Sequence, residues 1–269
     1  MGVDDLELDR EGTSPPPPTS PRANTRAWII GGVLVLAVLA GGLARWWTMK
    51  SPAPAPQAEA PAAATEVPLP AETVVLPPLD QMDPFLRGLL GALSARPELA
   101  RWLATDGLIR QMAAAIDRVS RGASPASDLR VLAPDREFLT ARRGRAREID
   151  PASYARYDGL AETLAGMDPA AVAHAYRTIR PRLDEAYKAM GRADSDVDVA
   201  VQRALEVLIA TPLPEGPVRV VEGRGATWAF ADPALEALDP VQKQLLRMGP
   251  DNAARVIETL RRIQQQLAS

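Results

Sequence analysis

An uncharged apolar run near the beginning of the chain constrains its architecture more than any other feature. Residues 27–44 (AWIIGGVLVLAVLAGGLA) carry no charge over 18 positions. As a helix this run extends about 27 Å, close to the hydrocarbon thickness of a bilayer. Indole rings favour the headgroup layer, and arginine reaches water from a membrane edge. The sequence therefore predicts one transmembrane helix over residues 27–47, with four residues at the membrane interface: Trp28, Arg45, Trp46 and Trp47.

Two alternatives for this run remain open. A buried core helix would need cover on all its faces, and the proline-rich stretch that follows offers none nearby. A cleaved signal peptide is favoured by the small residues Gly42 and Ala44 before Arg45. However, an acid-rich leading tail and an apolar run longer than about 15 residues are unusual for a signal peptide.

The orientation follows from the arrangement of the segments rather than from charge. Two basic residues precede the run and two follow it, so the positive-inside rule does not decide. A short leading tail before one span and a large C-terminal domain favours an N-terminus in the cytoplasm. We expect residues 1–26 to be a disordered cytoplasmic tail and the C-terminal domain to lie across the membrane.

Residues 48–78 are predicted to be a proline- and alanine-rich linker. Eight prolines lie between positions 51 and 78. Such a stretch favours extended polyproline II, with a maximal reach on the order of 85 Å. We interpret it as a spacer; a docking ligand for a proline-binding module is the alternative, as it is for Pro15–Pro18.

The remaining residues, 79–269, are long enough to bury a core and are predicted to be mainly helical. An Asp-Pro pair precedes five helix-forming runs, and aspartate as N-cap with proline at the first helical position is a strong helix start. The five pairs begin at Asp83, Asp150, Asp168, Asp232 and Asp239. Further helices are expected from Pro97, from Asp106, over 194–210 as the central helix and over 251–267 as the last. Pro181 predicts a kink or break after Ile179.

Two short stretches are typical of strands. Residues 137–142 and 145–149 flank Arg143-Gly144, and residues 218–221 and 227–230 flank two glycines. The fold class is thus a multi-helix bundle, mainly α, with one or two short β-hairpins, preceded by a single transmembrane helix.

Composition excludes most catalytic chemistry. The chain has no cysteine and one histidine, which removes thiol catalysis and multi-histidine metal centres, and we expect no metal or cofactor. Residues 79–269 hold 26 basic and 26 acidic residues, so nucleic acid is not an expected partner. His174 stands alone on a predicted helix. The stretch 194–198 resembles the opening of a calcium loop but lacks its glycine and its final glutamate.

A candidate binding surface combines arginines with aromatic residues. Five arginines lie in and beside the first predicted hairpin, where lipid headgroups or an acidic partner find positive charge. A pair of tyrosines lies on the helix after Asp150, and Trp228 lies near the second strand pair; core packing is the alternative for these aromatics. The candidate residues are Arg142, Arg143, Arg145, Tyr154, Arg156, Tyr157 and Trp228.

Several stretches together resemble the bacterial domain of unknown function 3014 family. They are residues 96–103 (RPELARWL), 150–158 (DPASYARYD), 211–217 (TPLPEGP), 230–235 (FADPAL) and 242–250 (QKQLLRMGP). The resemblance covers the whole globular part. It implies a bacterial inner-membrane protein with one N-terminal span and transfers no catalytic residue.

These observations favour binding over catalysis. The first hypothesis is an inner-membrane protein with a cytoplasmic N-terminus, whose periplasmic helical domain binds an envelope protein or a cell-wall partner. The alternative is a cell-envelope hydrolase that uses paired carboxylates, since two acids need only converge in space. A third hypothesis is the inverted orientation, with a cytoplasmic partner.

Overall fold

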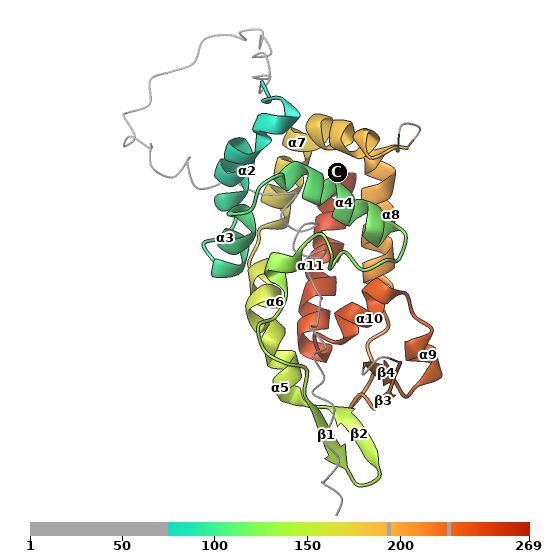
Figure 1. The fold of residues 1–269 in the computed structure, drawn as a ribbon. Helices are drawn as coiled ribbons and strands as arrows, with labels where there is room; N and C mark the ends of the chain where they lie inside the picture. Colours follow the sequence, from blue (N-terminus) through green and yellow to red (C-terminus); the bar gives the residue numbers. More distant parts are fainter. Residues whose placement is uncertain (1–74, 193–194, 225–226) are drawn as a thin grey trace, which may run out of the picture.

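The computed structural model describes residues 75–192, 195–224 and 227–269 (Figure 1). The elements are η2 (Leu79–Gln81), α2 (Met82–Gly91), α3 (Pro97–Leu103), α4 (Leu108–Ser120), η3 (Arg130–Leu132), β1 (Thr140–Arg143), β2 (Ala146–Ile149), α5 (Pro151–Tyr154), η4 (Ala155–Tyr157), α6 (Asp158–Ala165), α7 (Pro169–Ala189), α8 (Val197–Ile209), β3 (Val220–Glu222), β4 (Trp228–Phe230), α9 (Pro233–Glu236), α10 (Pro240–Leu246) and α11 (Pro250–Ala268). The expected helical domain with two small hairpins is confirmed.

The predicted membrane span lies outside the described residues. Within residues 75–192, 195–224 and 227–269, no helix combines the length and apolarity needed to cross a bilayer. The leading tail and almost all of the predicted linker are likewise outside the part of the chain that the structure describes.

Helix α4 lies at the centre of the bundle. It packs against α7, α8 and α2. Its apolar positions recur every three to four residues, and Leu108, Met112 and Ile116 are fully buried. The sequence favoured residues 194–210 as the central helix, but α8 leaves Val199 64 % exposed. Helix α4 takes the central place because small alanines on its remaining faces let neighbours approach closely.

Helix α11 closes the bundle from the other side. It packs along α6, α7 and α8 and runs back toward the end of the molecule where α4 crosses (Figure 1). Ala253, Val256 and Leu260 carry its buried face. The predicted last helix is therefore confirmed, with bounds one residue longer at each end.

Four of the five Asp-Pro starts cap the helices they precede. The carboxylate of Asp150 accepts a hydrogen bond from the Ala152 amide at 2.8 Å. Asp168 and Asp232 do the same for α7 and α9, and Asp239 forms a capping box with Gln242 at the start of α10. These caps satisfy amide groups that have no partner inside their own helix.

Asp83 caps a different helix from the one the sequence predicts. Helix α2 already begins at Met82, and the Asp83 carboxylate accepts from the amides of Gly107 and Leu108 at 2.7 and 2.8 Å. Gly107, at the start of α4, has φ of 70° and no side chain with which to cap. Helix α4 therefore begins at Leu108 rather than at Asp106, with its cap supplied by α2.

Helix α7 is continuous through Pro181. It runs from Pro169 to Ala189 without a break, so of the predicted kink or break after Ile179 the break is excluded. A proline costs the helix one backbone hydrogen bond. Here Ile179 and Leu183, on either side of Pro181, are both fully buried. Tertiary packing thus holds the helix together where local preference would end it.

A buried acid ties the end of α4 to the end of α7. Asp117 is 8 % exposed. Its two carboxylate oxygens accept from Arg192 Nε at 2.9 Å and from a terminal nitrogen of the same guanidinium at 3.2 Å. Arg121 also pairs with this carboxylate. Two arginines thereby offset the cost of burying one charge.

The two hairpins are separate two-stranded antiparallel sheets. The loop of the first is Gly144–Arg145 rather than Arg143–Gly144, and φ of 61° at Gly144 explains the position of the turn. The hairpins are joined by one bridge between Glu148 and Arg219. Beneath them lies a second, small hydrophobic cluster that includes Ile149, Val220 and Phe230.

Replacement of Asp83 should destabilise the fold through α4. We expect Asp83→Ala to lower the free energy of unfolding by about 1–2 kcal/mol, because two amides at the start of a buried helix lose their acceptor. Urea unfolding followed by circular dichroism measures this. Asp80→Ala is the matched control, since Asp80 is exposed and lies three residues away. Equal stability of the two variants would contradict the capping role.

Candidate functional site

The predicted binding residues gather at one end of the molecule. The strands β1 and β2 project from the lower end in Figure 1, with α5 and the β3–β4 hairpin beside them. Arg142, Arg143 and Arg145 are exposed on the projecting hairpin. We call residues Thr140–Ile149 the arginine hairpin.

Ser153 fixes the base of the arginine hairpin. Its hydroxyl is fully buried, accepts from the Leu139 amide at 2.6 Å and donates to the Leu139 carbonyl at 2.8 Å. The Asp150 amide donates to the same carbonyl at 3.1 Å. The strand entering the hairpin is therefore held to the start of α5 at a single point.

Arg147 joins the two hairpins through an aromatic ring. Its guanidinium lies 4.9 Å from the centre of the Trp228 ring and donates to Thr140 Oγ1 at 3.0 Å. The Ile149 amide also donates to the Val218 carbonyl at 3.0 Å. Trp228 is half-buried under this contact. The sequence placed Arg147 among the hairpin charges without predicting its aromatic partner.

The exposed arginines of the arginine hairpin form no ion pair with an acidic residue in the described part of the chain. They are Arg142, Arg143 and Arg145. Arg142 lies directly opposite Arg147 in the strand register. Like charges in this arrangement repel and destabilise a hairpin. The sequence therefore keeps a locally unfavourable pairing between an exposed arginine and a half-buried one, and departures of this kind are typical of functional positions.

Tyr157 is a core residue and not part of a surface. It is 1 % exposed, and burial raises the pKa of its phenol. Arg156 beside it is half-buried and lies 5.0 Å from the Tyr157 ring and 5.5 Å from the Phe138 ring. It donates to the carbonyls of Ser153 and Arg136 at 2.8 and 2.9 Å. Burial lowers the pKa of Arg156. Its hydrogen bonds join the chain before the arginine hairpin to helix α5.

Arg247 has the same role beneath the second hairpin, and sequence reasoning missed it. Its guanidinium lies 5.0 Å from the Phe230 ring and donates to the Trp228 carbonyl at 3.0 Å. Burial lowers its pKa. Arg247 lies in the 242–250 stretch that carries the family resemblance, and this is its one distinguishing signal in the sequence.

Tyr154 packs against the start of α11. Gly249 has φ of 88° and ψ of 159°, a region almost confined to glycine. A Cβ at this position would lie 2.5 Å from Tyr154 Cγ. Burial, and then the charge of Glu148, raise the pKa of Tyr154 to about 12. Tyr154 is thus half-buried in the junction between bundle and hairpins.

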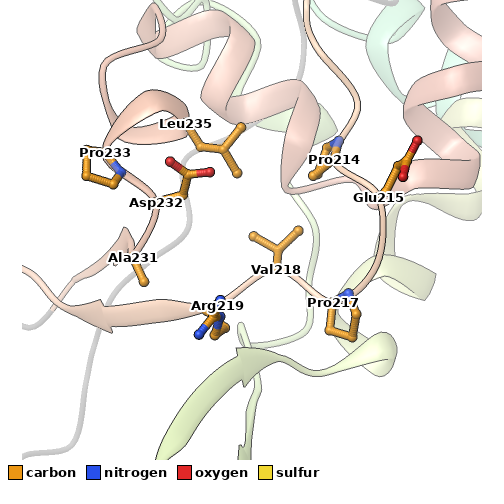
Figure 2. A pocket seen from close by; sticks show the side chains of 9 residues that line it. All are labelled: Pro214, Glu215, Pro217, Val218, Arg219, Ala231, Asp232, Pro233 and Leu235. Carbon is orange, nitrogen blue, oxygen red and sulfur yellow. The ribbon is translucent and has the colours of Figure 1, made fainter.

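A hollow lies between the loop before β3 and helix α9 (Figure 2). Its volume is about 450 Å³, and its lining includes three prolines together with Val218 and Leu235. The carboxylates of Glu215 and Asp232 lie on opposite sides of it in Figure 2. Asp232 already accepts from the Ala234 amide at 2.9 Å as the cap of α9. The hollow offers space to a partner side chain rather than a pair of converging acids.

The other candidate positions have structural explanations. His174 is exposed on α7. Asp196 caps α8, and Asp198 accepts from Arg180 Nε at 2.6 Å and pairs with the Tyr176 hydroxyl. Burial raises the pKa of Asp198, but hydrogen bonds from Arg180 and Tyr176 lower it by more, so this pKa lies below its usual value. Among the described residues no group of three histidine or acidic side chains is placed to hold a metal.

The model of a family described as protein of unknown function (DUF3014) matches residues 108–264. This range exceeds half of the chain. The chain belongs to the DUF3014 family. The match starts at the first residue of α4 and includes the arginine hairpin, so the family expected from the sequence is confirmed. It covers less than the whole globular part, because the 96–103 stretch lies before it. No curated protein and no solved structure matches the chain.

The four tyrosines of this DUF3014 protein should resist ionisation while it is folded. The pKa of each is raised, chiefly by burial. The unfolded chain loses its phenol protons near pH 10, before the folded chain does. The free energy of unfolding should therefore fall as the pH rises from about 10 toward 12. Phenolate absorbance measures both states.

Tyr154→Phe should remove the part of the folded-state absorbance change centred near pH 12. A tyrosine of the folded chain that ionises near pH 10 would contradict these environments.

Replacement of Gly249 should destabilise the junction. We expect Gly249→Ala to lower the free energy of unfolding by about 2–3 kcal/mol, through backbone strain and the collision with Tyr154. Gly191→Ala is the control, because Gly191 has φ of 85° but no atom near its Cβ position. It should cost about 1 kcal/mol. Denaturant unfolding compares the two, and equal losses would rule out the Tyr154 contact.

Proposed function

We propose that this protein is a single-pass envelope protein that acts by binding, with its arginine hairpin directed at an anionic envelope partner. The predicted span over residues 27–47 would hold it in a bacterial inner membrane. Its N-terminus would be cytoplasmic and its helical domain periplasmic. A protein or a cell-wall component is the partner expected from sequence.

The arginine hairpin carries this proposal. Three exposed guanidinium groups lack ion pairs within the described residues and lie on a braced, projecting element. The chain enters the domain at the other end: the described residues begin near the top of Figure 1, where Arg182 in the second half of α7 donates to the Leu76 carbonyl at 3.2 Å. The predicted linker therefore attaches far from the surface proposed to bind.

Nothing in the hollow beside the hairpin favours the alternative of an envelope hydrolase. Paired-carboxylate hydrolysis needs two carboxyl groups about 5–9.5 Å apart across one substrate. Glu215 and Asp232 lie on opposite sides of the hollow, and Asp232 is engaged as a helix cap. Binding is the function better supported by these side chains.

Tethering would supply the mechanism. A membrane span confines the domain to a layer near the bilayer, and a linker of about 85 Å maximal reach sets the depth of that layer. Confinement raises the effective concentration of the hairpin near any target within reach. A modest intrinsic affinity then suffices for occupancy.

Membrane extraction and a topology reporter test the proposal. We expect the full chain to stay in membranes washed with alkaline carbonate, with its N-terminal residues retained. A reporter fused after Ser269 should be active only outside the cytoplasm. Release by carbonate, a mature chain starting at Arg45, or reporter activity confined to the cytoplasm would each overturn it.

A further inference from the structure

We infer that the arginine hairpin docks on an anionic phospholipid surface. This inference rests on the proposed function, because it names the chemistry of the partner that the anchored domain would meet. The phosphate groups of lipid headgroups accept the planar, two-pronged hydrogen bonding of guanidinium groups.

The directions of the arginine side chains fit a planar layer of phosphates. Arg142 and Arg143 are consecutive in β1 and so point to opposite faces of the hairpin. Arg145 lies in the two-residue loop at the tip. A folded acidic protein would have to enclose both faces to meet all three, whereas a headgroup layer approached tip-first meets them together.

The tip has no apolar residue of the kind that dominates protein interfaces. Between Thr140 and Glu148 the apolar side chains are those of Ala141 and Ala146. Protein–protein hot spots are rich in aromatic side chains that fill pockets. Trp228, a large aromatic of the neighbouring β3–β4 hairpin, is covered by Arg147. The hairpin therefore offers charge without an anchor, which suits contact at the level of the headgroups.

The braces hold these charges ready for contact. Ser153 fixes the entering strand, and Arg147 holds the hairpin on Trp228. An anion between Arg142 and Arg147 would relieve their repulsion across the strands. Docking would therefore need little reordering of the backbone, and it would replace an unfavourable pairing by favourable ones.

The predicted tether makes a weak contact effective. A contact of this kind is screened by salt, because the Debye length falls from about 10 Å at 0.1 M to about 3 Å at 1 M. Residues 79–269 are neutral overall, so the domain as a whole gains no attraction to an anionic surface. A domain of this size has an expected radius of gyration of about 16 Å. The maximal reach of the linker, about 85 Å, is more than twice that radius. The hairpin end is thus free to turn toward the bilayer that holds the chain.

Energy transfer in liposomes containing the full chain tests the docking. Because the chain has no cysteine, one fluorophore can be placed at Leu139→Cys, beside the hairpin, or at Met190→Cys, at the far end of α7. Both positions are exposed, 47 % and 39 %. The acceptor is a headgroup-labelled lipid, in liposomes of phosphatidylcholine alone or with about one third phosphatidylglycerol.

We expect transfer from position 139 to exceed transfer from position 190 only in the liposomes that contain phosphatidylglycerol. This excess should vanish at 1 M salt. Arg142→Gln, Arg143→Gln and Arg145→Gln together should lower the docked-to-undocked ratio by about 100-fold. The matched control changes Arg110, Arg203 and Arg255 to Gln. These are exposed and lack ion pairs with described residues, so the same charge is lost at scattered places. This control should leave docking unchanged.

Several outcomes would overturn the inference. Equal transfer with and without phosphatidylglycerol, or equal losses in the two triple variants, would exclude the hairpin as a lipid contact. Slower tumbling of the label on addition of poly-L-glutamate, without transfer to lipid, would assign the hairpin to a carboxylate-bearing partner instead. Carbonate extraction of the same liposomes distinguishes failure of the proposed membrane anchor from failure of the inferred docking. A chain washed free refutes the anchor, whereas a chain that is retained but undocked refutes the docking alone.

Discussion

Burial of α4 is the constraint on which the rest of the domain depends. Where a helix is packed against neighbours on most of its surface, little water reaches its first amides or its one acid, so both need protein partners. Asp83 reaches across from α2 to the amides, and Arg192 returns from beyond α7 to Asp117. These two long-range contacts hold α2 and the end of α7 against the bundle. The packing of α4 thereby determines where its neighbours begin and end.

The hairpin end is assembled by a different kind of interaction. Arg156 and Arg247 are partly buried and form no ion pair with a described carboxylate, although the charge of Glu236 acts on Arg247. Arg156 donates to two backbone carbonyls and Arg247 to one, and each lies over an aromatic ring. Guanidinium groups tolerate such sites because they are planar and weakly hydrated. Their positive charge therefore remains at the junction between the hairpins and the bundle.

Local rules predicted much of the fold, and long-range packing determined the rest. Asp-Pro pairs gave four helix starts because a cap acts within one turn, whereas the partner of Asp83 lies 24 residues away. Pro181 predicted a kink or a break in α7, and the buried residues on either side of it keep the helix continuous. In the candidate site, charge patterning identified the three exposed arginines. It did not distinguish buried Tyr157 from half-buried Tyr154, nor find Arg247, since burial depends on elements distant in sequence.

The small hydrophobic cluster under the hairpins is separate from the core of the bundle. Protein regions with their own modest cluster open independently of the whole, as units that hydrogen exchange resolves. The amides of β3 and β4 are therefore expected to exchange through a local opening, while those of α4 exchange only on global unfolding. The surface proposed to meet a partner would then open and close locally, with a free energy of its own, while the bundle stays folded.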